Sequence, residues 1–142
     1  MRAQCIKTGF HRILGQKTIN RFAAWACIII VAVLSLVPAE QMTRTGLSGH
    51  VEHVLAYVAT AFITATAYGE RTIIWVIIAL LTYAGVLEFL QRFSPGRTSS
   101  LEDYLFSGVG VLIGVGAFVL LSRLLLRSNE PADRPSATQI SN

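Results

Sequence analysis

Residues 73–87 read IIWVIIALLTYAGVL, fifteen consecutive positions without a charged side chain, and the run stops at Glu88. A helix that crosses a membrane needs roughly 20 mostly apolar residues, with about 17 as a lower limit. This run reaches that length when the polar residues at its ends are counted. It is typical of a transmembrane helix, because a water-soluble helix of this length carries charges along one face.

Three further uncharged runs cover residues 22–37, 54–69 and 104–122. The chain has 142 residues, of which 53% are hydrophobic and 14% charged, and the charges fall between the runs. This length suits a single domain. We therefore predict an all-α fold, a four-helix transmembrane bundle. Residues 1–21 would form a basic N-terminal arm, residues 22–126 the transmembrane domain, and the polar residues 127–142 a disordered tail.

The basic residues predict how the helices are oriented. Nine of the twelve lie in the arm, in the connection after residue 69 or after the fourth run, whereas the two opposite loops hold only Arg44, Arg92 and Arg97. Cytoplasmic segments carry the excess of Lys and Arg. We expect the protein to lie in a cell membrane of the bacterial inner-membrane type, with both termini in the cytoplasm. The lipid bilayer is thus a partner, and the net charge of +4 suits contact with anionic lipid.

The sequence also bears on nucleic-acid binding and on cleavage of the first run as a signal peptide. No basic stripe with interleaved aromatic residues is present, so we expect no nucleic-acid partner. A signal peptidase could cut after the small residues that follow the first run, near Ala39. Cleavage would leave three helices with the C-terminus still inside, so topology does not exclude it.

Polar residues collect at the ends of the runs that face outward. His53 and Tyr57 share a helical face, and so do Glu88 and Gln91. Ionisable groups at membrane depth normally face the bundle interior and pair with each other. We expect a ligand-binding site here, formed by His53, Tyr57, Glu88, Gln91, Arg97, Ser100 and Asp103. Small residues that let helix backbones approach closely are Gly85 in the third run and Ser107, Gly110 and Gly114 in the fourth.

This set of motifs resembles the VanZ-like family of membrane proteins. The family pattern is a His-x-x-x-Tyr helix start, a Glu-x-x-Gln helix end, an Arg-Thr/Ser loop and an Asp-x-x-x-Asn-x-x-Gly helix start. The corresponding positions lie between residues 48 and 116, as His53 with Tyr57, Glu88 with Gln91, Arg97 followed by Thr98, and Asp103 with Gly110.

Two positions depart from the family pattern. Gly49 and His50 stand where an acidic-basic pair is common, and Ser107 stands where the family has Asn. The resemblance implies a multi-pass envelope protein whose namesake is linked to lowered susceptibility to a glycopeptide antibiotic. It does not by itself imply resistance.

The residues support two functional hypotheses. In the first, the outer site binds an anionic envelope lipid or lipid-linked glycan, with Arg97 and the start of the fourth helix holding phosphate. In the second, the protein is a membrane-embedded hydrolase or transferase. In that hypothesis His53 is the general base, and Tyr57 or Asp103 orients it. Glu88 is a further candidate catalytic residue, and Arg97 stabilises the charge that develops in the reaction.

Structural interpretations remain open for several of these residues. Glu88 could form an ion pair with Arg92 or Arg97 that only holds the third helix in place. Ser100 and Asp103 have the spacing of a helix-capping box. His53 and Tyr57 could be an interfacial pair. We expect no cofactor and no metal ion, and the sequence leaves the oligomeric state open.

Overall fold

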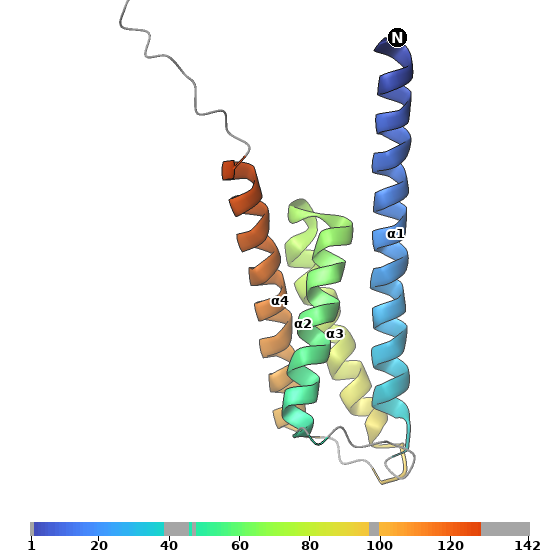
Figure 1. Ribbon diagram of the computed structural model, residues 1–142. Helices are drawn as coiled ribbons and strands as arrows, with labels where there is room; N and C mark the ends of the chain where they lie inside the picture. Colours follow the sequence, from blue (N-terminus) through green and yellow to red (C-terminus); the bar gives the residue numbers. More distant parts are fainter. Residues whose placement is uncertain (1, 39–45, 47, 97–99, 129–142) are drawn as a thin grey trace, which may run out of the picture.

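A computed structural model describes the backbone of residues 2–38, 46, 48–96 and 100–128, and within these ranges the side chains of residues 16–127. The described part is helical, as predicted (Figure 1). Its elements are α1 (Arg2–Leu36), α2 (Gly49–Tyr68), the short 3-10 helix η2 (Glu70–Thr72), α3 (Ile73–Gln91) and α4 (Leu101–Ser128).

Successive helices run in opposite directions. The start of α1 and the end of α4 therefore lie at one end of the molecule, together with η2 (Figure 1). We call this the η2 end. The other end is formed by the last turns of α1 and α3 and the first turns of α2 and α4, and we call it the polar end.

Three helical stretches are long and apolar enough to cross a membrane: Gln16–Leu36, Glu70–Gln91 and Leu101–Arg127. They expose large hydrophobic side chains, such as Ile29, Trp75 and Leu112, that would face lipid. The chain is thus a membrane protein with several apolar helices.

Helix α2 is not among the stretches that meet this criterion of length and hydropathy. It carries Glu52, two histidines and three threonines within 20 residues. Its position explains this composition, because α2 packs against both α1 and α4 and so presents less surface to lipid. At 1.5 Å per residue it is about 30 Å long, close to the thickness of a hydrocarbon core.

The most extensive helix contact joins α2 and α4. Two glycines of α4 make it possible. A Cβ atom on Gly110 would stand 2.6 Å from the Val54 carbonyl oxygen, and one on Gly114 would overlap the Val58 carbonyl oxygen. Such small-residue surfaces let membrane helices approach closely, as the sequence indicates for this stripe.

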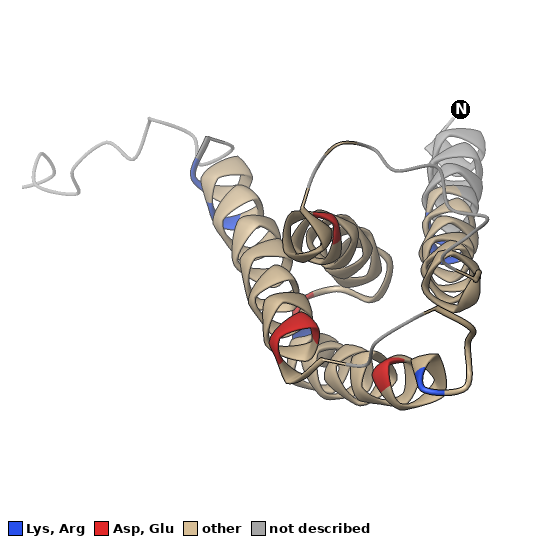
Figure 2. Cartoon of the chain, turned by 90° about the horizontal axis from the view of Figure 1, so that it is seen from below, with Lys and Arg blue, Asp and Glu red and all other residues tan. Residues whose placement is uncertain are grey.

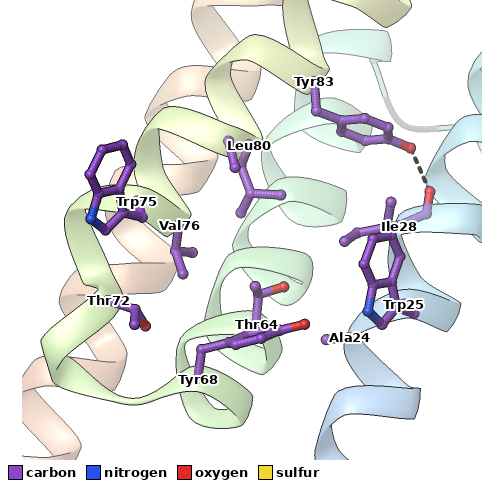
Figure 3. A pocket seen from close by; sticks show the side chains of 11 residues that line it. Ala24, Trp25, Ile28, Thr64, Tyr68, Thr72, Trp75, Val76, Leu80 and Tyr83 are labelled. Atoms are coloured by element: carbon purple, nitrogen blue, oxygen red, sulfur yellow. Dashed lines mark hydrogen bonds between the residues drawn. The ribbon is translucent and has the colours of Figure 1, made fainter.

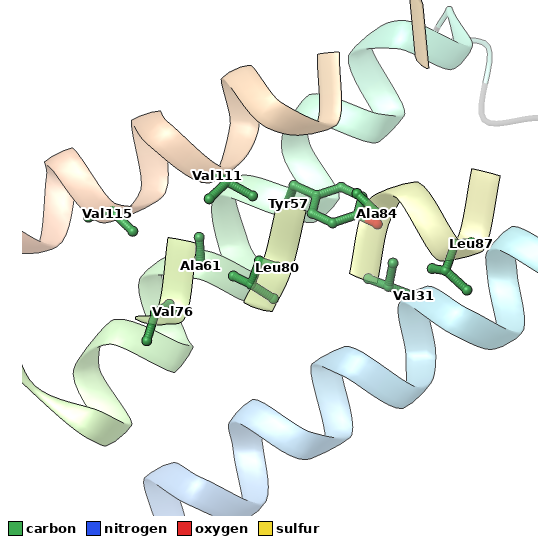
Figure 4. Packing of buried hydrophobic residues seen from close by; sticks show 9 residues of the cluster. All are labelled: Val31, Tyr57, Ala61, Val76, Leu80, Ala84, Leu87, Val111 and Val115. Carbon is green, nitrogen blue, oxygen red and sulfur yellow. The ribbon is translucent and has the colours of Figure 1, made fainter. Parts of the chain in front are cut away.

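The buried core is narrow and draws on all four helices (Figure 4). Tyr57 and Val111 are its largest fully buried apolar side chains, at 2% and 0% exposure. The other members are aliphatic residues of modest size: Val31, Ala61, Val76, Leu80, Ala84, Leu87 and Val115. A thin core of this kind is expected when the outer faces of the helices are solvated by lipid.

The helices extend beyond the apolar runs that predict them. Helix α1 is continuous from Arg2, so residues 2–21 of the predicted basic arm are helical and join the first run without a break. Its 35 residues give about 52 Å, more than a hydrocarbon core, so its first turns lie beyond the apolar layer. Helix α4 reaches Ser128, and the remaining residues 129–142 of the predicted tail lie outside the described residues.

Candidate functional site

Charged residues mark the ends of the helices, and the helix bodies between them carry few (Figure 2). At the polar end, His50 joins α2 to α4. Its Nδ1 lies 2.9 Å from Asp103 Oδ1, its Nε2 lies 3.7 Å from Glu102 Oε2, and its ring stacks on Phe106 with centroids 4.6 Å apart. His50 is not among the site residues that the sequence predicts. Its spacing of three from His53 was the available signal, because such residues share a helix face.

A second contact between the same helices involves His53. Its Nδ1 lies 3.3 Å from the Ser107 hydroxyl, which donates a hydrogen bond to the Asp103 carbonyl oxygen at 2.8 Å. The serine proton is thereby used, so His53 Nδ1–H is the donor to the serine oxygen. This assigned tautomer leaves Nε2 of a neutral His53 as the available acceptor.

Helix α3 reaches the first turn of α4 through Glu88. The Glu88 carboxylate accepts a hydrogen bond from the backbone N–H of Ser100, the residue before α4. The Ser100 hydroxyl accepts one from the Glu102 N–H at 3.1 Å. Ser100 is therefore the N-cap of α4.

This cap differs from the capping box that the sequence indicates. In a capping box, the third helical residue returns a hydrogen bond to the N-cap N–H. Here Glu88 of another helix fills that role, and Asp103, the third residue of α4, binds His50 instead. The structural interpretation of Ser100 thus applies, with α3 supplying the second half of the motif.

Tyr57 and Gln91 are both buried, each with 2% of its surface exposed. Tyr57 lies close enough to Glu88 to interact with it electrostatically. Glu88 itself is 9% exposed, so the shared face of Glu88 and Gln91 points into the bundle. Tyr57 therefore links the α2–α4 contacts to the buried end of α3.

The remaining predicted residues are placed as follows. Ser107 is buried, and Gly110 and Gly114 form the α2–α4 contact described above. A Cβ atom on Gly85 would meet the Tyr104 ring at an ordinary 3.5 Å, so close packing does not require a glycine there. Arg97 lies outside the described residues.

Carboxylates dominate the described charges at the polar end. Glu52, Glu88, Glu102 and Asp103 lie there with two histidines, and the Arg92 guanidinium lies over the exposed Phe89 ring, 5.9 Å from its centroid. Within the described ranges, no three His, Cys, Asp or Glu side chains are grouped so that they could hold a metal ion. The chemistry on offer is hydrogen bonding by carboxylate, imidazole, amide and hydroxyl groups.

These features define a class: a multi-helix membrane protein with buried polar side chains gathered at one end. The family model described as VanZ/LLP1 matches residues 10–122, which is most of the chain. The chain belongs to the VanZ/LLP1 family. No curated protein and no solved structure matches it.

Proposed function

We propose that the polar end of this VanZ/LLP1 protein binds the head group of a lipid-linked glycan at the outer face of a cell membrane. The observation that carries the proposal is the burial of Glu88 and Gln91 at the end of an otherwise apolar helix. Polar side chains at membrane depth are costly and mark sites of recognition. In this proposal all four helices span the membrane, with both termini cytoplasmic.

The polar groups at this end favour a sugar-bearing lipid over a simple anionic lipid. Carboxylate and amide groups such as those of Glu88 and Gln91 accept hydrogen bonds from sugar hydroxyls. Arg97 comes six residues after Gln91 in the sequence, and we assign its guanidinium to the phosphate that links the sugar to the lipid. Glu88 and Gln91, with His53, Tyr57, Ser100 and Asp103, would contact the sugar.

The test compares three lipids added to purified protein in phosphatidylcholine nanodiscs. They are a polyprenyl diphosphate that carries a disaccharide, the same polyprenyl diphosphate without sugar, and phosphatidylglycerol. We expect the sugar-bearing lipid to bind most tightly. Replacing Gln91 by Met should weaken its binding about tenfold, which corresponds to a lost hydrogen bond of roughly 1.4 kcal/mol. Arg97→Gln should weaken binding of both diphosphates.

The matched control is Gln16→Met, since Gln16 is exposed on α1 far from the polar end. Thermal unfolding of each variant shows whether it remains folded. Equal binding of all three lipids, or unchanged binding in folded Gln91→Met and Arg97→Gln variants, would end this proposal.

The same samples test the enzymatic alternative. In the structure, the Asp103 carboxylate contacts His50, and His53 Nδ1 contacts the Ser107 hydroxyl, so Asp103 is not arranged to orient His53 as a general base. We therefore place binding first. Release of sugar or phosphate from the lipid over time, lost in His53→Ala, would favour the hydrolase or transferase instead.

A further inference from the structure

A recess lies in the half of the bundle toward the η2 end, away from the polar end. It has a volume of about 510 Å³ and is walled by α1, α2 and α3 (Figure 3). This volume is within the roughly 300–1,000 Å³ typical of small-molecule sites. We call it the lateral pocket. Its wall is formed mainly by Ala24, Trp25, Ile28, Thr64, Tyr68, Trp75, Ala79, Leu80 and Tyr83.

The pocket is apolar and open toward the side of the bundle. Trp25 and Trp75, on α1 and α3, keep 56% and 68% of their surfaces exposed, so the lipid-facing surface runs into the pocket. At one end the Tyr83 hydroxyl donates a hydrogen bond to the Ile28 carbonyl oxygen, which holds α3 to α1 (Figure 3). Tyr68, the last residue of α2 and two residues before η2, lies at the other end.

Thr64 is unusual among the threonines of α2. The hydroxyls of Thr60 and Thr66 donate to the carbonyl oxygen four residues earlier, which is the usual way to satisfy a hydroxyl in an apolar helix. Thr64 lines the pocket and is only 6% exposed, and its hydroxyl has no hydrogen-bond partner. Within the described ranges it is the only buried side-chain polar atom in that state. Such a group has a free-energy cost until an acceptor reaches it.

A positive charge stands beside the same end of the pocket. The Arg21 guanidinium lies over the Tyr68 ring, 5.5 Å from its centroid, and Tyr68 forms part of the pocket wall. Arg21 is exposed, one turn before Trp25 on α1. The order from the η2 end inward is therefore cation, aromatic ring and apolar wall, which matches the phosphate and then the acyl chain of a phospholipid.

We propose that the lateral pocket holds one acyl chain of an anionic phospholipid, with the phosphate beside Arg21. The apolar walls select a hydrocarbon chain, and Arg21 selects an anionic head group. This site is separate from the polar end and does not depend on the function proposed there.

The two tryptophans of the chain both line the pocket, which makes intrinsic fluorescence a direct probe. Protein is reconstituted in phosphatidylcholine vesicles, and a fixed fraction of the lipid is replaced by brominated phosphatidylglycerol or brominated phosphatidylcholine. Bromine quenches a tryptophan that it contacts. We expect brominated phosphatidylglycerol to quench more strongly at the same mole fraction, because bound lipid adds to the quenching by bulk lipid.

Three variants locate the bound lipid. Arg21→Gln should reduce the preference for phosphatidylglycerol about fivefold, the effect expected for one basic residue near the surface. Ala79→Phe should fill the pocket and remove the preference. Thr64→Val keeps the shape and should leave the preference unchanged, because the Thr64 hydroxyl oxygen is fully buried and out of reach of the lipid. Matched controls are Arg123→Gln and Ala117→Phe on α4, whose side chains are exposed outside the pocket.

Equal quenching by the two brominated lipids would overturn the proposal, as would a preference that survives in Ala79→Phe. A preference lost equally in Arg123→Gln would also overturn it, because it would show only general attraction to the basic end. If Ala79→Phe instead converted a dimer to a monomer, the occupant would be a second copy of the chain, and the lipid assignment would be wrong.

Discussion

Gly110 and Gly114 show how single residues set the geometry of this protein. Each lies where α4 crosses the backbone of α2, and in each case the atom that an added methyl group would meet is a backbone carbonyl oxygen. A backbone oxygen within a helix cannot move aside as a flexible side chain can. The separation of the two helices therefore depends on the absence of side chains at these positions.

We predict that Gly114→Ala destabilises the protein by about 1–3 kcal/mol, the usual effect of overpacking. Unfolding by sodium dodecyl sulfate in mixed micelles measures the change. The matched control is Gly116→Ala, since a Cβ atom there meets nothing within 4 Å. Alanine favours helix over glycine, so this control should be neutral or slightly more stable. Equal loss in both variants would mean that helix contact is not the cause.

At the scale of the element, the first turn of α4 depends on partners from outside the helix. The first N–H groups of any helix lack partners within it. Here Ser100 caps one of them, and Glu88 of α3 accepts from the N–H of Ser100 itself. His50 of α2 holds the Asp103 carboxylate in the same turn. The start of α4 is thus tied to both neighbouring helices.

We predict that Ser100→Ala lowers stability by about 1 kcal/mol, the typical value for a lost N-cap. Ser48→Ala is the matched control, because Ser48 precedes α2 but forms no side-chain capping hydrogen bond. Amide hydrogen exchange should become faster at residues 101–104 in Ser100→Ala and stay unchanged at the start of α2 in Ser48→Ala. Faster exchange at neither site would show that the cap contributes nothing.

At the scale of the whole molecule, the number of membrane crossings decides where the termini lie. Three stretches meet the length and hydropathy needed to span, and α2 fits the thickness of a bilayer only by its length. Because the four helices alternate in direction, the start of α1 and the end of α4 lie at the same end (Figure 1). If α2 spans with the others, both termini share one side of the membrane.

We predict that both termini are cytoplasmic and that the polar end is outside. Green fluorescent protein fluoresces in the cytoplasm but not after export in an unfolded state. Fusions of it to either terminus should therefore be bright. Alkaline phosphatase, which is active only outside, should be active when inserted after Gly46 and inactive after Gly69. Bright fluorescence at one terminus alone would mean that α2 does not cross.

How much could be predicted from the sequence differs between elements. The uncharged run ending at Glu88 predicts α3 closely, because a helix in lipid must satisfy its own backbone and so must be continuous. The helical structure of the arm before residue 22 was not predicted, since hydropathy reports only the part of α1 that lies in lipid. The glycine stripe predicted close packing of α4, but its partner α2 could not be named without the coordinates.

At the candidate site, helical spacing indicated which residues share a face but not which contacts they make with other helices. Spacing along one helix places Glu88 with Gln91 on one face, since that depends only on 3.6 residues per turn. It gives no information about which residue of another helix will lie opposite. His50 was omitted from the predicted site for this reason. The enzymatic hypothesis has either Tyr57 or Asp103 orienting His53, and in the structure Asp103 binds His50.

The sequence alone therefore determined that this is a helical membrane protein of the VanZ-like kind, with polar residues concentrated toward one side. Composition and helical spacing are local properties, and lipid permits few other structures for such runs. Tertiary structure alone decided that Glu88 completes the cap of α4 and that Thr64 borders a pocket without a partner. Both depend on how the helices are rotated and spaced, which is set by contacts between residues distant in the sequence.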